Sequence, residues 1–419
     1  MLDIKFIREN PSLVQKAAKN KNIDVNIDHL LEIDQKYRQL QQEVQALREE
    51  RNAFTKEIQG KPTDEQIGKG KDFKEKLEKE EHALSAVKEE LDGQLLKIPN
   101  VPADDVPVGK DESGNKEVKK VGDIRQFDFT PKSHEDLATA LDLYDTKHAV
   151  NIAGTRAYFL KGDLVFLEQA VLQYALDYMR AQDFTAMTVP WMVHKNALYG
   201  TGYFPWGEED HYTTQDGQVL IGTAEVSLTA YHKDDILQEK DLPVKLVGIS
   251  PCFRREVGSY GKDTKGFFRV HQFSKVEQVV LTVADETITR EWHEKMLGYA
   301  EHLLQELKLS YRVLLMCTGD MGAGQRKKYD IEVWFPSQKK YRETHSASYF
   351  NDFQSRRLNM KYKTKNGETK YVYTLNNTVV ATPRLLAAIL ENYQEEDGSI
   401  IVPEVLQKYM HNPVIKSSK

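Results

Sequence analysis

Two long runs of apolar residues at alternating intervals of three and four dominate the first hundred residues. The first run is broken only at Arg51, and in the second Glu80 stands where one apolar residue is due. Such spacing gives each helix a single narrow apolar seam, as in a coiled coil. Gly60 and Pro62 lie between the runs, where a helix stop is expected. The apolar positions are Leu30, Ile33, Tyr37, Leu40, Val44, Leu47, Phe54 and Ile58, and then Phe73, Leu77, Leu84, Val87, Leu91, Leu95 and Ile98.

We therefore predict an antiparallel helical hairpin on the order of 45 Å long, from about 30 residues per helix at 1.5 Å each. Neither helix has a second apolar face, so we expect the hairpin to stand in solvent as an arm and not within a globular core. On these residues alone, a dimerising coiled coil or a spacer is the alternative.

The rest of the chain is organised differently. Residues 98–116 hold three prolines and two glycines and lack periodicity, which indicates a linker. From about Gly122 onward, aromatic and β-branched runs alternate with helical stretches, which predicts a mixed α+β domain of roughly 300 residues. We place the domains at residues 1–105 and 106–419.

Composition excludes several classes of protein. A chain of 419 residues with only two cysteines, Cys252 and Cys317, cannot build a disulfide framework or a zinc cluster, so we expect a reducing compartment and no zinc. The N-terminus lacks the apolar core of a signal peptide, and no apolar run approaches the roughly 20 residues of a membrane span. We expect a cytoplasmic protein without membrane contact. A net charge of −6 requires any RNA binding to use local basic surface.

The segment from Ser250 to Glu277 reads as a strand, a long polar loop and a second strand. Alternating residues run up to Phe253 and resume at Phe267, and the stretch between them holds three glycines and four cationic side chains. A hairpin usually needs about two to five loop residues, so the excess length indicates a function. We predict that this basic loop meets an anion beside a sheet.

A helix that begins near residue 382 carries a second candidate anion site. Thr382 and Pro383 fit the N-cap and the first residue of that helix, which puts Arg384 in its first turn. The helix dipole disfavours a cation there. The placement makes sense if the helix end and Arg384 together receive a polyphosphate, and a surface arginine is the alternative.

Two further segments hold carboxylates after apolar strands. Thr223-Ala-Glu225 follows one such strand, and by itself a helix cap explains it better than a binding site. Glu343 lies in Tyr341-Arg-Glu-Thr-His-Ser346, after an alternating strand over 329–336. For Glu343, the alternative to a binding role is an ion pair with a nearby Lys or Arg. For Glu277, the alternative is an ion pair with Lys275.

In this order the segments resemble the signature motifs of class II aminoacyl-tRNA synthetases. The wording F-R-R-E-x-G-S-x-G-x-D-T-x-G, followed by H-Q-F-x-K-V-E, is similar to the seryl branch. A helix over 163–181 and a strand ending at Pro190 resemble the first motif, which builds a dimer interface in that family. The resemblance extends to about Met410. It implies an α+β fold, with an antiparallel-sheet class II catalytic domain and an N-terminal antiparallel coiled-coil arm.

The resemblance also implies the reaction, which is ATP-dependent activation of L-serine to seryl-adenylate and transfer of serine to the 3′ end of tRNA. Glu225 would bind the α-amino group and Glu277 the hydroxyl, while Arg254 would span the carboxylate and the α-phosphate. The implied serine-binding residues are Thr223, Glu225, Arg254, Glu277, Asn376 and Thr378.

ATP and a divalent ion would lie beside serine. Glu343 and Ser346 would hold Mg²⁺ against the phosphates, since hard oxygen ligands suit this ion. Phe268 or Phe267 would line the base pocket. For His345, a contact with the main chain or with tRNA is favoured over a catalytic role. The implied ATP-binding residues are Arg254, Arg255, Glu256, Phe268, Val270, Glu343, Thr344, His345, Ser346 and Arg384.

The implied partners are serine tRNA, the selenocysteine tRNA where one exists, and a second copy of the chain in a homodimer. Asn377 and Pro383 depart from the usual wording of the third motif, which puts the shape of that loop in doubt more than its role. Two other functions remain open on the sequence. They are an inactive tRNA-binding regulator, and a ligase that charges a carrier protein, although the arm speaks against the second.

Overall fold

The computed structural model describes residues 1–58, 60–258 and 266–417. Its packing divides the chain into two compact units, Met1–Pro99 and Asn100–Lys419. This division falls before the boundary placed after residue 105 from the sequence, because the backbone that follows Pro99 already bonds to the second unit. Asn100 and Ala103 donate their N–H groups to the carbonyls of Ala323 and Arg326.

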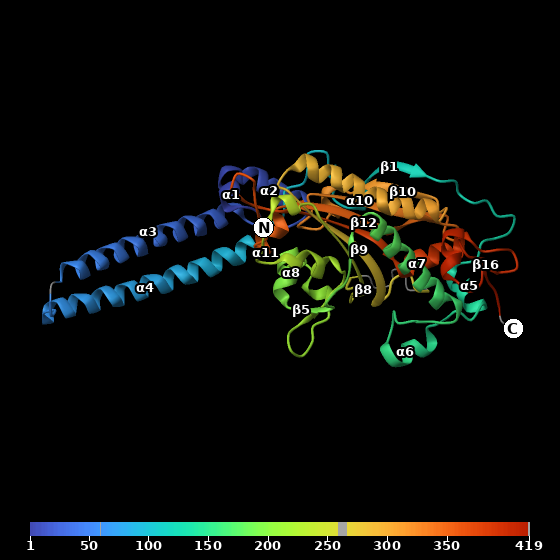
Figure 1. Ribbon diagram of the computed structural model, residues 1–419, viewed down its shortest axis with the longest axis horizontal. Coiled ribbons are helices and arrows are strands. Elements are labelled where there is room, and N and C mark those ends of the chain that lie inside the picture. The colour runs from blue at the N-terminus through green and yellow to red at the C-terminus, as the bar shows by residue number, and fades with distance from the viewer. Residues whose placement is uncertain (59, 259–265, 418–419) are drawn as a thin grey trace. The chain divides into compact units, whose positions relative to one another are not determined.

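The first unit consists of short and long helices (Figure 1). The capping box of Thr63 and Gln66 starts the last of them, and Gly60 between the two long helices has a φ of +83°, a left-handed value that glycine adopts at little cost. The described helices are α1 (Ile4–Glu9), α2 (Pro11–Asn20), α3 (Ile27–Glu57) and α4 (Asp64–Leu95).

The two long helices pair with each other along the predicted seam. Val44 of α3 and Val87 of α4 are both buried. Arg48 and Glu81 form an ion pair of 2.7 Å across the helices, and farther along the rings of Phe54 and Phe73 lie 5.7 Å apart between centroids. Residue numbers rise along α3 as they fall along α4, so the pairing is antiparallel. This confirms the predicted coiled-coil arm, with both helices supplied by one chain.

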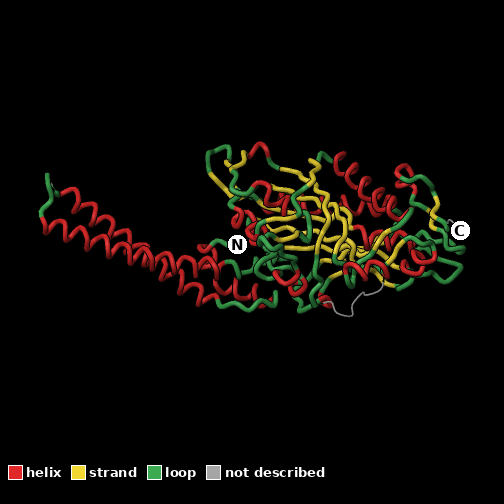
Figure 2. The backbone as a smooth tube through the Cα atoms, turned by 90° about the horizontal axis from the view of Figure 1, so that it is seen from below, coloured by secondary structure: helices red, strands yellow, loops and turns green. Residues whose placement is uncertain are grey.

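A mainly antiparallel sheet forms the middle of the second unit (Figure 2). Among the described residues, all neighbouring strands of this sheet are antiparallel except β8 and β4, which are parallel. The predicted α+β class is therefore confirmed. In spatial order the strands are β1 (Lys116–Val121), β10 (Tyr311–Leu315), β11 (Lys327–Phe335), β12 (Lys340–Asn351), β15 (Tyr373–Ala381), β9 (Gln272–Thr282), β8 (Val244–Phe253) and β4 (Thr185–Thr188).

Helices and short ribbons surround this sheet. The helices are α5 (His134–Ala140), α6 (Lys147–Ala153), α7 (Asp163–Ala181), α8 (Lys195–Thr201), α9 (Glu225–Thr229), α10 (Glu286–Glu306), α11 (Phe353–Leu358) and α12 (Thr382–Asn392). The short ribbons are β2 (Tyr144–Asp145) with β3 (Phe159–Leu160), β5 (Met192–Val193) with β6 (Val219–Leu220), β16 (Ile400–Ile401) with β17 (Val414–Ile415), and β14 (Thr369–Tyr371) with β13 (Lys361–Lys363) and β7 (Ile236–Gln238). Among the described residues, no helix combines the length and the apolar character needed to cross a bilayer.

The two faces of the sheet are covered by different apolar clusters. On β9, Val276 and Val280 belong to a large cluster that includes residues of α7, α10 and α12. Val279 and Leu281 point to the opposite face and belong to a smaller cluster with α8 and α9. By the same alternation, Glu277 faces the side of the smaller cluster. Toward the start of β9 the apolar cover of that side gives way to polar residues, and there the sheet is open to a cavity.

Candidate active site

A cavity of about 130 Å³ lies on this open part of the sheet. It brings together most of the residues that the sequence analysis assigned to serine, ATP and metal. Those that line it are Glu225, Arg254, Glu256, Phe268, Val270, Glu277, Glu343, Thr344, His345, Ser346, Asn376, Thr378 and Arg384.

One end of the cavity holds the buried carboxylate of Glu225. The hydroxyl of Tyr203 donates a hydrogen bond of 2.6 Å to one of its oxygens, and the amide of Gln354 donates one of 3.0 Å to the other. Burial raises the pKa of Glu225 to about 7, against the effect of the Tyr203 bond. Both of these hydrogen-bond donors are neutral groups, so the Glu225 carboxylate is suited to bind the ammonium group of a ligand.

Glu277 lies next to it and is also buried. Its Oε2 is 2.5 Å from the ammonium of Lys275, and it accepts a hydrogen bond of 3.3 Å from the hydroxyl of Thr378. Burial raises the pKa of Glu277, although Lys275 opposes this effect. The ion pair weighed from the sequence therefore exists, and it lies inside the cavity because both residues line it.

Arg254 lines the cavity and follows the last residue of β8. Its Nε donates to the carbonyl oxygen of Gly222 at 3.3 Å, and its guanidinium lies 5.3 Å from the centre of the Phe273 ring. These contacts orient the planar group of Arg254, which lines the cavity. A planar fork of this kind can bind a carboxylate and a phosphate together.

A β-bulge places Glu343 and Ser346 on the same face of β12. In a regular strand, residues three apart point to opposite faces. Here Glu343 pairs with Glu332 and His345 pairs with Ile331, so Thr344 is an extra residue in the ladder. Ser346 pairs with Asp330, two residues from Glu332, and its side chain therefore returns to the side of Glu343.

His345 joins this bulge to a second one on β15. Its Nδ1 lies 2.8 Å from the hydroxyl of Thr344, and its Nε2 lies 3.1 Å from the carbonyl oxygen of Val379, the extra residue of the second bulge. Burial lowers the pKa of His345 to about 4. The ring is therefore neutral at physiological pH and bonds to the main chain.

Arg384 and Glu343 bind each other across the mouth of the cavity. One guanidinium nitrogen of Arg384 donates to the main-chain oxygen and to Oε2 of Glu343, at 2.9 and 3.0 Å. The same guanidinium lies 5.0 Å from the centre of the Phe268 ring. Partial burial by itself would raise the pKa of Glu343, but Arg384 and then Lys328 outweigh it and lower the pKa to about 2.

The start of α12 differs by one residue from the sequence prediction. Ala381 is the N-cap and Thr382 is the first helical residue, with Pro383 behind it. The hydroxyl of Thr382 does not cap the helix, because it donates to Glu168 at 2.8 Å and accepts from the N–H of Ser274. The N–H groups of the first turn of α12 therefore have no side-chain cap among the described residues.

The oxygens beside Ser346 fit a hard divalent cation. Asp330 is buried opposite Ser346, and its Oδ1 has no hydrogen-bond partner among the described residues. With the carboxylate of Glu343 and the hydroxyl of Ser346 it forms an oxygen-rich set of the kind that Mg²⁺ prefers. A buried carboxylate oxygen left unsatisfied is costly unless a cation or water meets it.

Two predicted residues lie outside the cavity lining. The hydroxyl of Thr223 accepts a bond of 3.2 Å from the N–H of Glu225, but Thr223 is not the cap of α9, whose N-cap is Ala224. Arg255 points away, and its guanidinium donates to the carbonyl oxygen of Glu209 at 2.9 Å. Phe267, the alternative to Phe268 for the base pocket, is fully buried in the large apolar cluster.

Gly261, Lys262 and Lys265 of the basic loop lie outside the described residues. On the described side of that loop, Glu256 has a φ of +55° and its carboxylate forms a close ion pair with Arg269.

Seven lining residues were not assigned to serine, ATP or metal from the sequence, namely Tyr203, Arg269, Phe273, Lys275, Gln325, Ala381 and Pro383. Lys275 could have been found, because it stands two residues before Glu277 on the same strand. Tyr203, Phe273 and Gln325 carried no signal: the first and last of these lie in loops far along the chain from the motifs they approach, and an aromatic residue in a strand usually belongs to a core.

Comparisons with known proteins agree with this geometry. The family model described as "Seryl-tRNA synthetase N-terminal domain" matches residues 1–102, and "tRNA synthetase class II core domain (G, H, P, S and T)" matches residues 210–393. A "Serine--tRNA ligase" of Deinococcus radiodurans is 44% identical over 98% of this chain and 97% of its own. One of Brucella abortus (strain S19) is 44% identical over 98% of each.

Two solved structures show the same likeness in three dimensions. The seryl-tRNA synthetase of Pyrococcus horikoshii, complexed with ATP, superposes with a TM-score of 0.92 at 39% identity and covers 100% of both chains. The cytoplasmic serine-tRNA ligase of Naegleria fowleri, in complex with AMP, has a TM-score of 0.89 at 33% identity, over 100% of this chain and 99% of that one.

Proposed function

The chain belongs to the seryl-tRNA synthetase family and is a serine--tRNA ligase of class II, and from this premise we propose how its residues perform the reaction. In the first step the carboxylate of serine attacks the α-phosphorus of ATP, and pyrophosphate leaves. In the second step the seryl group passes from the adenylate to a hydroxyl of the terminal adenosine of tRNA, and AMP leaves. The two other functions that the sequence left open find no support in these comparisons.

The observation that carries the proposed roles is that Glu225, Arg254 and Glu277 line one cavity. Glu225 binds the α-ammonium group of serine, because a cation compensates the negative charge of the buried Glu225 carboxylate. Arg254 binds the carboxylate of serine and an oxygen of the α-phosphate, which brings the attacking and reacting atoms together. Positioning of this kind supplies much of the rate in a reaction that needs little covalent help from the protein.

The side chain of serine is read by Glu277 with Thr378. Its hydroxyl donates to the carboxylate of Glu277, which also lies 2.5 Å from the ammonium of Lys275. Asn376, two residues from Thr378 on β15, completes this part of the site. Thr223 supports it indirectly, through its bond to the N–H of Glu225.

ATP lies at the other end of the cavity. The adenine packs against Phe268 beside the backbone of Val270, and Glu256 meets its edge. Arg384 leaves Glu343 and binds the terminal phosphate, helped by the N–H groups at the start of α12. Arg254 and the relocated Arg384 then stabilise the charge of the departing pyrophosphate.

Glu343 and Ser346 are the residues that would hold Mg²⁺, with Asp330 behind them. The ion neutralises charge on the polyphosphate when it is bound. Thr344 and His345 line the cavity and keep these oxygens on one face through the bulge.

The partners follow from the rest of the chain. We assign the arm to the tRNA, since a solvated helical hairpin offers a long polar surface. We propose a homodimer through the region of α7, where Phe159, Val165 and Phe166 are exposed apolar residues. Serine tRNA is the substrate, together with the selenocysteine tRNA where one exists. Both cysteines are free and buried, which fits a reducing cytoplasm.

Serine-dependent exchange of labelled pyrophosphate into ATP tests the proposal. We expect exchange with serine and a divalent ion, none without serine, and charging of total tRNA when tRNA is added. Exchange that is absent with serine, or supported equally by other amino acids, would contradict the assignment of the cavity.

A further inference from the structure

A loop on the far side of β12 also reaches the cavity. It joins the short 3-10 helix η5 (Thr318–Asp320) to β11, and among its residues Gln325 lines the cavity together with the serine-site residues. No motif marks this glutamine in the sequence. Its place in the cavity raises the question of what it contacts and what holds it there.

Gln325 is fixed at both ends of its amide. Its Nε2 donates to the hydroxyl of Ser348 at 2.8 Å, and its Oε1 accepts from the N–H of Gly322 at 2.6 Å. Ser348 is fully buried on β12 and pairs directly with Asn376 on β15. Paired residues of a ladder share one face, so Gln325 forms the wall of the cavity next to Asn376.

The backbone on both sides of Gln325 is fastened by the segment Asn100–Val106, which we call the strap. The N–H of Asn100 donates to Ala323, and its side-chain amide donates to the carbonyl oxygens of Gly324 and Phe350 at 3.0 and 2.8 Å. The N–H of Ala103 donates to Arg326 at 2.8 Å. Asn100 is only 4% exposed, so these bonds are shielded from water and hold the loop firmly.

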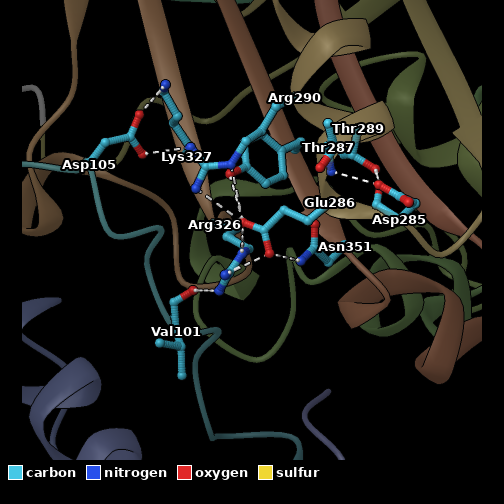
Figure 3. Close-up of polar contacts among 11 residues, drawn as sticks. Val101, Asp105, Asp285, Glu286, Thr287, Thr289, Arg290, Arg326, Lys327 and Asn351 are labelled. Atoms are coloured by element: carbon cyan, nitrogen blue, oxygen red, sulfur yellow. Dashed lines mark hydrogen bonds and ion pairs between the residues drawn. The ribbon is translucent and has the colours of Figure 1, made fainter.

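The strap is in turn tied to the start of α10 (Figure 3). Arg326 donates to the carbonyl oxygen of Val101 at 3.1 Å and forms an ion pair of 2.9 Å with Glu286. Asp105 pairs with Lys327 at 2.7 Å and with Arg290 at 3.2 Å. The side chain of Asp105 therefore anchors the strap without touching the residues on either side of Gln325.

Gly324 shows how closely the loop is packed. A Cβ atom added there would lie 2.9 Å from the ring of Phe353, which belongs to α11 and is fully buried. The ring leaves little room on this side of the loop, and Asn100 holds the loop backbone through hydrogen bonds. Gln325 thus presents a rigid wall.

We propose that Gln325 is a specificity-determining residue, which closes the serine site beside Asn376 against larger amino acids, and that Asn100 is the positioning residue which keeps it there. The proposal rests on the proposed function of the same cavity and adds to it. Threonine exceeds serine by one methyl group, and only a wall that does not yield can reject so small a difference by shape. The reading of the hydroxyl by Glu277 would not distinguish these two amino acids, since both have one.

The test compares pyrophosphate exchange with serine and with threonine. In Gln325→Ala we expect kcat/KM for threonine relative to serine to rise roughly 10-fold or more, the size of effect that one methyl group gives in a pocket. Gln325→Met keeps the length of the side chain without its amide and should recover most of the rejection. Gln325→Ser provides a second shortened variant should the alanine protein fold poorly. An unchanged ratio in the shortened variants, with serine exchange intact, would overturn the proposal.

Asn100→Ala tests the positioning role, and Asp105→Asn is its matched control in the same strap. We expect Asn100→Ala to raise the threonine ratio in the same direction as Gln325→Ala but by less, and to raise the KM for serine more than it lowers kcat. Asp105→Asn should leave the threonine-to-serine ratio of kcat/KM unchanged, even if it lowers the melting temperature as much as Asn100→Ala does. Equal shifts in both strap variants would overturn the role of Asn100. Wild-type protein without serine exchange would instead refute the proposed function itself.

Discussion

Serine differs from alanine by one hydroxyl, and in this cavity the oxygen proposed to accept its hydrogen bond belongs to Glu277. That carboxylate is buried and paired with Lys275, so alanine would leave its remaining acceptor capacity unmet. Unpaired buried polar groups allow discrimination of about 10⁴ or more. We therefore expect strong rejection of alanine and weaker rejection of threonine, against which only shape acts.

Glu277→Gln tests this account of the hydroxyl. An amide still accepts a hydrogen bond but carries no charge, and it leaves Lys275 without its partner. We predict that kcat/KM for serine falls about 10- to 100-fold, as expected when a charge-assisted bond is lost, while the serine-to-alanine ratio narrows. Pyrophosphate exchange with both amino acids measures it. Glu301→Gln is the control, because Glu301 is also buried and paired with a lysine, Lys119, but lies outside the cavity. A ratio that does not move would mean that Glu277 serves the fold alone.

Arg384 allows a second test at single residues. Its guanidinium now binds Glu343, and we propose that ATP draws it away. Arg384→Ala should raise the KM for ATP and slow adenylate formation, because a charge-assisted contact with a phosphate is worth roughly 1.5–3 kcal/mol. ATP dependence of pyrophosphate exchange is the measurement. Arg312→Ala breaks another Arg–Glu pair on the same sheet. This control variant should leave the KM for ATP unchanged. If both variants exchange equally well, Arg384 has no part in binding ATP.

At the scale of elements, alternation predicted the strands and Pro383 predicted the start of α12 to within one residue, whereas the two β-bulges were not predicted. Alternation by itself predicts Glu343 and Ser346 on opposite faces. The extra residue Thr344 returns Ser346 to the face of Glu343. His345 holds this bulge, because its two ring nitrogens contact residues of two different bulges. Such a three-way contact arises only once distant strands are paired, so no local pattern in the sequence reveals it.

This role of His345 gives a pH dependence. Its pKa of about 4 in the folded chain lies below the ordinary value of 6.5, so the unfolded chain binds the proton first as the pH falls. The contribution of His345 to the free energy of unfolding is complete above about pH 6.5. It is lost progressively between pH 6.5 and 4, by up to about 3 kcal/mol. His293 is buried with a pKa of about 4 as well and adds to the same window.

His345→Gln should therefore flatten the pH profile of stability. We predict that the wild-type free energy of unfolding, measured with urea, falls more steeply between pH 6.5 and 4 than that of the variant, by about one proton in slope. His293→Gln should flatten it by a similar amount without affecting the cavity. Parallel profiles for wild type and His345→Gln would show that the ring of His345 is not neutral in the folded state.

At the scale of the whole molecule, the arm was predictable because apolar residues three and four apart form its seam. Both helices also come from one continuous stretch of chain. The strap was not predictable. Residues 98–116 read as a linker because prolines break every pattern, yet Asn100 and Ala103 bond to a loop more than 200 positions away. Contacts of that separation depend on the packing of the complete unit.

The proposed division of labour between the two units leads to the last prediction. Removing residues 45–86 and joining Val44 to Val87 through a short glycine-serine loop deletes the outer arm but keeps its base. The cavity does not depend on that part, so serine activation should persist. Charging of tRNA should be lost, because the shortened chain lacks the surface assigned to the tRNA. Since phosphate contacts dominate such binding, the full chain should also lose affinity for tRNA steeply as salt is raised.

The most direct test of the account measures two activities on the same two preparations, full chain and shortened arm. One is serine-dependent pyrophosphate exchange, and the other is charging of total tRNA with labelled serine. The account predicts equal exchange in both proteins and charging by the full chain only. Equal charging by the two proteins, or loss of exchange in a shortened chain that is still folded, would contradict it.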